Sequence, residues 1–164
     1  MFYINTFVLF SFLGFFLESF VYKWSLSRRH SGALYGPYTL VYGLGFTLII
    51  FIFSNLKFNL GYINYLIYYL IFCFICTLCE MVCGFLINFI FHKDMWDYSS
   101  YPLHFTKYVC LKYFFVWGLF CFVFVFFSYD FWLSIINIIP YYFSIIVLFV
   151  MVIDLIFSFI KSRN

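Results

Sequence analysis

Charged side chains are scarce in this sequence, and their scarcity excludes a water-soluble fold. Asp, Glu, Lys and Arg together make up 9% of the 164 residues, whereas soluble domains carry about 25%. Hydrophobic residues make up 67%, and the mean hydropathy is +1.07. Because so few charges cannot cover a water-exposed surface, the solvent must be a lipid bilayer. The length then predicts a single transmembrane helical domain over residues 1–164.

The sequence also lacks the motifs of several enzyme classes and of nucleic-acid-binding proteins. It contains no Walker A sequence, no nucleophile elbow and no H-E-x-x-H motif. No segment is long and basic enough to bind nucleic acid, although the net charge is +3. We therefore expect no nucleic-acid partner, and a non-enzymatic role is favoured over catalysis.

Long apolar runs dominate what is present. About 20 apolar residues cross the hydrocarbon core of a bilayer, and the runs predict an all-α, polytopic membrane protein with about five transmembrane helices. We expect a turn at Tyr129-Asp130 and a kink at Pro140 within the last helix. The predicted spans cover residues 2–22, 38–56, 63–91, 108–127 and 131–160.

Lys and Arg residues are unevenly distributed between the predicted connections. Eight of the nine lie after the first span, after the third span or in the C-terminal tail, whereas Lys57 alone lies on the opposite side. Connections rich in Lys and Arg stay in the cytoplasm. The count predicts an outside N-terminus, a cytoplasmic C-terminus and a multi-pass protein of the cell membrane that contacts membrane lipids.

One face of the third span gathers its small and polar residues at intervals of four: Cys76, Glu80, Gly84 and Asn88. A carboxylate facing lipid is costly, so Glu80 is expected to face the interior of the bundle. The first span carries a similar stripe: Ser11, Gly14 and Glu18. We expect the two stripes to pack against each other, so that Glu18 and Glu80 come close enough to interact.

Two interpretations of Glu18 and Glu80 are open. They form a proton, cation or substrate site within the bundle, or they make structural ion pairs with Arg28, Arg29 or Lys112. Asp154, near the end of the last span, either joins these carboxylates or pairs with Lys161 at the inner interface, and the pair with Lys161 is favoured.

The polar connections supply further candidates. Trp96-Asp97-Tyr98-Ser99 could bind a partner or a lipid headgroup, although an interfacial anchor followed by a capping residue is favoured. Arg28 and Arg29 most simply contact anionic lipid.

The cysteines are clustered in the third span. Four of them follow the C-x2-C-x2-C-x3-C spacing of an iron–sulfur run: Cys73, Cys76, Cys79 and Cys83. The segment is continuously apolar and helical, however, whereas cluster ligands need a loop. We expect small, buried hydrophobic residues, with no metal site and no cofactor.

Several short motifs occur in order along the chain. The first span ends Gly14-Phe15-Phe16-Leu17-Glu18, and Gly36-Pro37 precedes a helix that contains Gly43. Glu80 and Gly84 precede the tetrapeptide Trp96 to Ser99, and Trp117-Gly118 follows in the next span. In this order the chain resembles a family of small bacterial membrane proteins catalogued as type IV ABC-transporter permeases. That family often has a second Glu where Asn88 stands.

The resemblance implies a permease-like transport component with a cytoplasm-facing polar site. ATP would then be hydrolysed by a separate ATPase subunit, and the small size of the chain favours a homo-oligomer or a partner. One alternative is a membrane enzyme acting on a lipid or isoprenoid headgroup, with Glu80 and Asp97 as acid and base and Arg28 and Arg29 holding phosphate. Another is a membrane scaffold that transports nothing.

Overall fold

The computed structural model describes residues 1–24 and 34–162 of the chain, which form five helices and one short hairpin. The hairpin pairs β1 (His104–Thr106) with β2 (Val109–Cys110) in antiparallel fashion. The helices are α1 (Phe2–Trp24), α2 (Leu40–Asn55), α3 (Ile63–Phe91), α4 (Leu111–Ile138) and α5 (Tyr141–Ser162).

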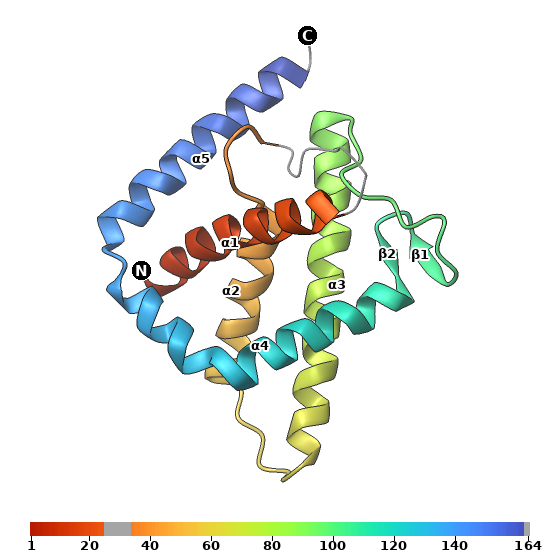
Figure 1. The fold of residues 1–164 in the computed structure, drawn as a ribbon, viewed down its shortest axis with the longest axis vertical. Coiled ribbons are helices and arrows are strands. Elements are labelled where there is room, and N and C mark those ends of the chain that lie inside the picture. Colours follow the sequence, from red (N-terminus) through yellow and green to blue (C-terminus); the bar gives the residue numbers. More distant parts are fainter. Residues whose placement is uncertain (25–33, 163–164) are drawn as a thin grey trace.

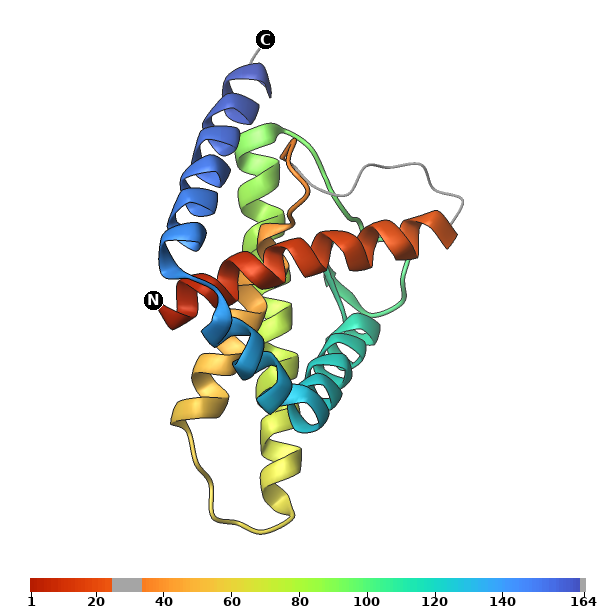
Figure 2. The same cartoon turned by 60° about the vertical axis from the view of Figure 1, so that its left-hand side comes forward.

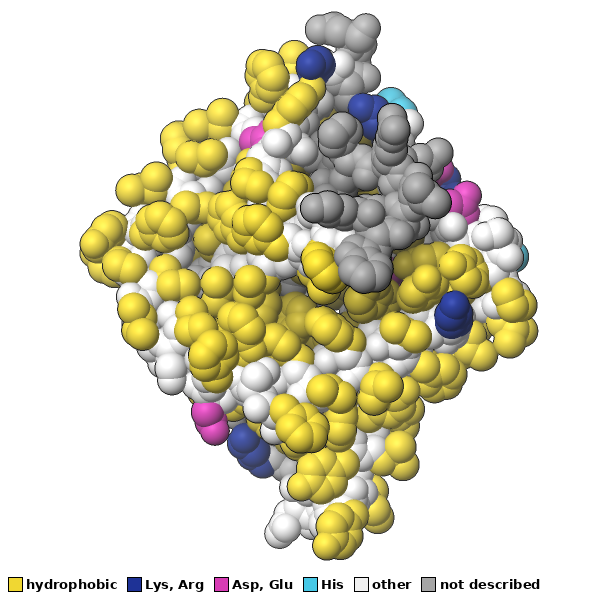
Figure 3. All heavy atoms as spheres, viewed as in Figure 1, with side chains coloured by type: hydrophobic (Ala, Val, Ile, Leu, Met, Phe, Trp, Pro, Cys, Tyr) yellow, Lys and Arg dark blue, Asp and Glu magenta, His cyan; other side chains and the backbone are white. Residues whose placement is uncertain are grey.

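Four of these helices contain segments that are long and apolar enough to cross a membrane: Phe2–Phe20, Ile63–Phe91, Leu111–Ile138 and Tyr141–Lys161. The remaining helix, α2, is apolar but has only 16 residues. Hydrophobic side chains cover most of the face seen in Figure 3, and charged side chains are few on it. The prediction of an all-α, polytopic membrane protein is therefore confirmed.

The predicted boundary between the last two spans is wrong. Helix α4 continues through Tyr129 and Asp130 to Ile138, and the chain breaks at Ile139 and Pro140. Proline disfavours the helical conformation of the residue before it, and Ile139 is extended with φ −67° and ψ 118°. Pro140 thus separates two helices, whereas Tyr129 and Asp130 offer no comparable obstacle to a helix.

Four of the helices form two closely packed pairs. Helix α1 packs mainly on α2, and α3 packs mainly on α4. In both ribbon views α2 and α3 run side by side, while α1 crosses them steeply (Figures 1 and 2). A core common to all four helices is centred on fully buried residues: Phe10, Ile49, Phe72 and Val125. The steep crossing carries the C-terminal end of α1 toward the end of the molecule where β1 and β2 lie (Figure 1).

The expected direct packing of α1 on α3 is not found. Among the described residues, α1 makes its extensive contacts with α2, α5 and α4. A Cβ atom at Gly14 would overlap the ring of Tyr42, and one at Gly84 would lie 2.5 Å from Cγ of Tyr108. An aromatic ring therefore fills the space beside each glycine, which leaves no room for the other helix.

Two further glycines allow close helix approach. A Cβ atom would meet the Ser11 hydroxyl at Gly43 and the Cys73 thiol at Gly118. These contacts join α2 to α1 and α4 to α3, and they hold each pair of helices at the separation that the site requires.

Candidate functional site: an acidic, aromatic cavity

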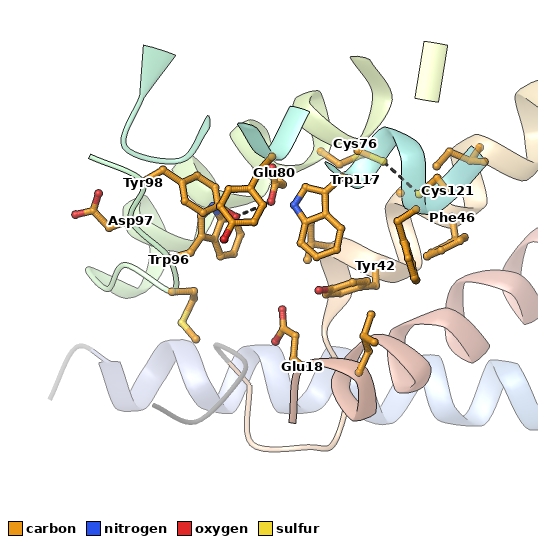
Figure 4. A pocket seen from close by; sticks show the side chains of 18 of the residues that line it. Glu18, Tyr42, Phe46, Cys76, Glu80, Trp96, Asp97, Tyr98, Trp117 and Cys121 are labelled. Carbon is orange, nitrogen blue, oxygen red and sulfur yellow. Dashed lines mark hydrogen bonds between the residues drawn. The ribbon is translucent and has the colours of Figure 1, made fainter. Parts of the chain in front are cut away.

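A cavity of about 640 Å³ lies between α1, α2, α3, α4 and the loop that follows α3 (Figure 4). Of its three acidic lining residues, Glu18 and Glu80 point their carboxylates into it, whereas Asp97 does not (Figure 4). Eight of the 19 lining residues are aromatic: Tyr42, Phe46, Trp96, Tyr98, Tyr101, Tyr113, Trp117 and Phe120. The structure thus brings together residues from four helices and one loop.

Glu80 is held on one wall of the cavity by the loop. The hydroxyl of Tyr98 donates a hydrogen bond to Oε1 of Glu80 at 3.1 Å. The Tyr98 ring stacks on Tyr113, with centroids 4.6 Å apart. The indole of Trp117 lies beside Glu80, and its nitrogen is turned toward the same region (Figure 4). That nitrogen is buried and lies near the carboxylate of Glu80 and the hydroxyl of Tyr98.

Glu18 occupies the opposite wall. Its carboxylate points into the cavity below Tyr42 (Figure 4). The hydroxyl groups of Tyr42 and Thr39 lie close to it. The two carboxylates therefore share one cavity, although their helices do not pack directly on each other.

The cavity has no cationic partner for these carboxylates among the described residues. None of the described lining residues is Lys, Arg or His. Lys112 lies over the rings of Tyr101 and Tyr113, 5.2 Å and 5.6 Å from their centroids. The structural ion pair proposed with Lys112 is thus not formed, while Arg28 and Arg29 lie outside the described residues.

The Trp96 to Ser99 segment divides between the cavity and the surface. Trp96 donates its indole N–H to the carbonyl of Tyr108 at 3.2 Å, and it lines the cavity together with Tyr98. Asp97 instead accepts the N–H of Ser99 at 2.8 Å. Although Asp97 borders the cavity, its exposed carboxylate points away from it (Figure 4).

Asn88 does not reach the cavity but joins a polar network around Asp94. The Asn88 amide donates to Asp94 at 2.9 Å, the Tyr108 hydroxyl donates at 2.6 Å, and Lys107 forms an ion pair at 2.9 Å. The hydrogen bonds from Tyr108 and then Lys107 hold the pKa of Asp94 below its ordinary value. This network fastens the loop to the end of α3, and sequence reasoning did not single out Asp94.

Asp154 belongs to a separate junction. It accepts hydrogen bonds from the backbone N–H of Gly36 at 2.8 Å, the N–H of Tyr35 at 3.2 Å and the hydroxyl of Tyr38. Lys161 instead lies over the ring of Tyr35, 5.0 Å from its centroid. The prediction that Asp154 pairs with Lys161 is therefore wrong, because the carboxylate accepts hydrogen bonds from backbone N–H groups just before α2 instead.

The cysteines of α3 lie on helical turns and not in a ligand loop. Cys76 lines the cavity and lies 3.5 Å, Sγ to Sγ, from Cys121 of α4. All six cysteines are free thiols. Among the described residues no group of three or more His, Cys, Asp or Glu side chains could hold a metal ion.

Sequence reasoning also missed the cavity face of α4. Tyr113, Trp117 and Cys121 all line the cavity, and they follow one another at intervals of four, as Cys76 and Glu80 do on α3. The same spacing in the sequence is the signal that identifies this face.

Fold and site together define a polytopic helical membrane protein that encloses an acidic, aromatic cavity. Residues 5–162 match the model of a family described as "Putative ABC-transporter type IV", and the chain belongs to this family. The family predicted from the short motifs is thereby confirmed. No curated protein and no solved structure matches the chain.

Proposed function

We propose that this protein is the membrane-embedded component of a transporter and that the cavity between Glu18 and Glu80 is its substrate site. The observation that carries the proposal is the convergence of these two carboxylates on one cavity inside largely apolar helices. Charged groups within membrane-spanning segments are costly and mark substrate or ion pathways. A volume of about 640 Å³ also lies within the range of small-molecule sites.

The energy source is expected to lie in a separate chain. The sequence has no Walker A motif, so an ATPase subunit is the partner that a transporter of this family would need. We propose that the complex lies in the cell membrane with the cavity open toward the cytoplasm, as the distribution of Lys and Arg predicts. A second copy of the chain would complete the pathway.

The enzymatic alternative receives less support from the geometry. An acid and a base that act on one headgroup must reach the same reacting atoms. The Asp97 carboxylate points away from the cavity, whereas Glu80 points into it (Figure 4). The pair proposed for catalysis is therefore not directed at a common point, and transport remains the better supported function.

Affinity purification of the tagged full-length protein from its own membranes tests the proposal. We expect an ATP-hydrolysing subunit to co-purify, and we expect the complex in lipid nanodiscs to hydrolyse ATP. Glu80→Gln should leave assembly intact but lower the hydrolysis that accompanies transport, whereas Asp130→Asn, on an exposed position of α4, should change neither. Purification without any ATPase, together with no uptake by reconstituted vesicles, would falsify the transport proposal.

A further inference from the structure

The rings around the cavity form a continuous wall beside the carboxylates. Tyr98 and Tyr113 stack with centroids 4.6 Å apart, and Tyr113 and Trp117 stack at 6.3 Å with an interplanar angle of 29°. Tyr42 meets Trp117 at 90° with centroids 6.0 Å apart. Electron-rich faces of Trp and Tyr attract cations that come within about 6 Å of the ring centroid. Such a corner of rings therefore suits a positively charged group.

The charge of the cavity points the same way. Glu18 and Glu80 enter from opposite walls, and no Lys, Arg or His lies among the described lining residues. Two carboxylates in a site of low dielectric resist ionising together unless a cation lies between them. Lys112 is not a lining residue, and its ammonium group lies over the rings of Tyr101 and Tyr113, which shows that rings of this wall already accept a cation.

The structure also narrows the kind of cation. The cavity holds no cluster of metal ligands among the described residues, and its wall has eight aromatic side chains but only two carboxylates that point inward. Divalent cations prefer several carboxylate, carbonyl or water oxygens, whereas alkylated ammonium groups prefer aromatic surfaces. In addition, the indole of Trp117 lies beside Glu80 (Figure 4), so the ring and the carboxylate can contact the same ammonium group.

We propose that the cavity binds an organic cation, a quaternary ammonium compound or a protonated amine, between Glu18 and Glu80 and against the rings of Tyr113 and Trp117. This inference rests on the proposed function in taking the cavity as the substrate site, and it names the class of substrate. The carboxylates supply charge recognition, and the rings replace the water that surrounds the ammonium group.

Isothermal titration of the purified full-length protein in nanodiscs with choline, and with the uncharged carbon isostere of choline, tests charge recognition directly. The two molecules have nearly the same shape, so a difference in affinity reports the charge. We expect choline to bind at least about tenfold more tightly than the isostere. Because Trp96 and Trp117 line the cavity, choline should also quench tryptophan fluorescence. Equal affinities, or no binding of choline and tetramethylammonium, would overturn the inference without any variant.

Substitutions then locate the site. Glu18→Gln and Glu80→Gln should each weaken choline binding by about tenfold or more, and Trp117→Leu should weaken it by about threefold or more. Asp97→Asn is the matched control, because its carboxylate borders the cavity but points away from it (Figure 4), and it should leave the affinity unchanged. An equal loss in Asp97→Asn and in the Glu variants would show long-range surface attraction and would overturn the assignment.

The two proposals fail in different ways. Charge-selective choline binding that depends on Glu18 and Glu80, without an ATPase partner or uptake, would retain the cation site and remove the transport function. Co-purification of an ATPase with ATP-driven uptake of another compound, but no cation binding, would retain transport and remove the cation site.

Discussion

Two aromatic regions of this molecule differ in what their rings enclose. In the packed region, around Phe10 and Phe72, rings fill the space between helices; Phe10 stacks on Phe46 with centroids 4.4 Å apart. In the cavity region, the rings of Tyr98, Tyr113 and Trp117 instead stand around an open volume with two carboxylates. An abundance of aromatic residues therefore does not by itself produce a filled core.

The difference arises from how the rings are held. In the packed region the rings are fixed by one another. At the cavity, backbone hydrogen bonds position the loop, because the Tyr98 N–H donates to the carbonyl of Lys107 at 2.7 Å and Trp96 donates to the carbonyl of Tyr108. The loop residues Trp96 and Tyr98 are thus held by the backbone at one wall, whereas Glu18 lies on the opposite wall, and the cavity lies between them.

The largest expected effect is a difference in the stability lost when a Phe is removed from each region. Phe72 is 0% exposed in the packed region, so Phe72→Ala should leave a void and cost about 3–5 kcal/mol. Phe120 lines the cavity and is 38% exposed. Because much of its ring is not packed, Phe120→Ala should lower the free energy of unfolding by less than about 1.5 kcal/mol. Chemical unfolding in detergent micelles measures both. Equal losses would mean that the cavity region is packed as tightly as the core.

A smaller effect is expected at Gly84, which packs against Tyr108 of the hairpin. A Cβ atom at Gly84 would lie 2.5 Å from Cγ of Tyr108, which is buried, so Gly84→Ala should push the hairpin outward and cost about 1–3 kcal/mol. Gly45 also lies in a helix, but nothing lies within 4 Å of its Cβ position. Gly45→Ala should therefore be neutral or stabilising, since Ala favours helices over Gly. Unfolding temperatures of the two variants should move in opposite directions, and the cavity argument fails if Gly84→Ala is equally well tolerated.

The smallest expected effect is a pH dependence at the loop. Asp94 has a lowered pKa in the folded protein, so its stabilising contribution is fully present above the ordinary Asp value of about 4. The contribution is lost as the pH falls through the lower folded value. Asp94→Asn should therefore reduce the acid-induced drop in unfolding temperature, while Asp130→Asn serves as the surface control. An unchanged acid profile in Asp94→Asn would show that the network does not stabilise the fold.

The elements with long apolar patterns could be predicted from the sequence. The predicted third span, residues 63–91, has the same bounds as α3, and the predicted membrane class and family are confirmed. These predictions succeeded because a helix in lipid must satisfy its own backbone, whatever its neighbours are. The i, i+4 spacing also predicts that Glu80 faces away from lipid, and the structure places Glu80 on the cavity wall.

The partners of each face could not be predicted in the same way. Periodicity gives the face on which Gly14 and Gly84 lie, but not that Tyr42 and Tyr108 occupy the adjoining space. Asp154 was assigned to the nearest cation in sequence, whereas its partners are backbone donors over 100 residues away. Contacts of this kind depend on which helices cross. The spacing of residues within one helix does not show which distant segment will pack against it.

The junction at Asp154 has a mechanical consequence. Its carboxylate ties α5 to the segment before α2, through Tyr35, Gly36 and Tyr38. The N–H of Thr39, next in the chain, is bonded to the carbonyl of Ser11 on α1 at 2.9 Å. The segment just before α2 is thus hydrogen-bonded to both α1 and α5. Any widening of the cavity that moves α1, and Glu18 with it, away from Glu80 must therefore also displace the start of α2 or break the bond between Thr39 and Ser11.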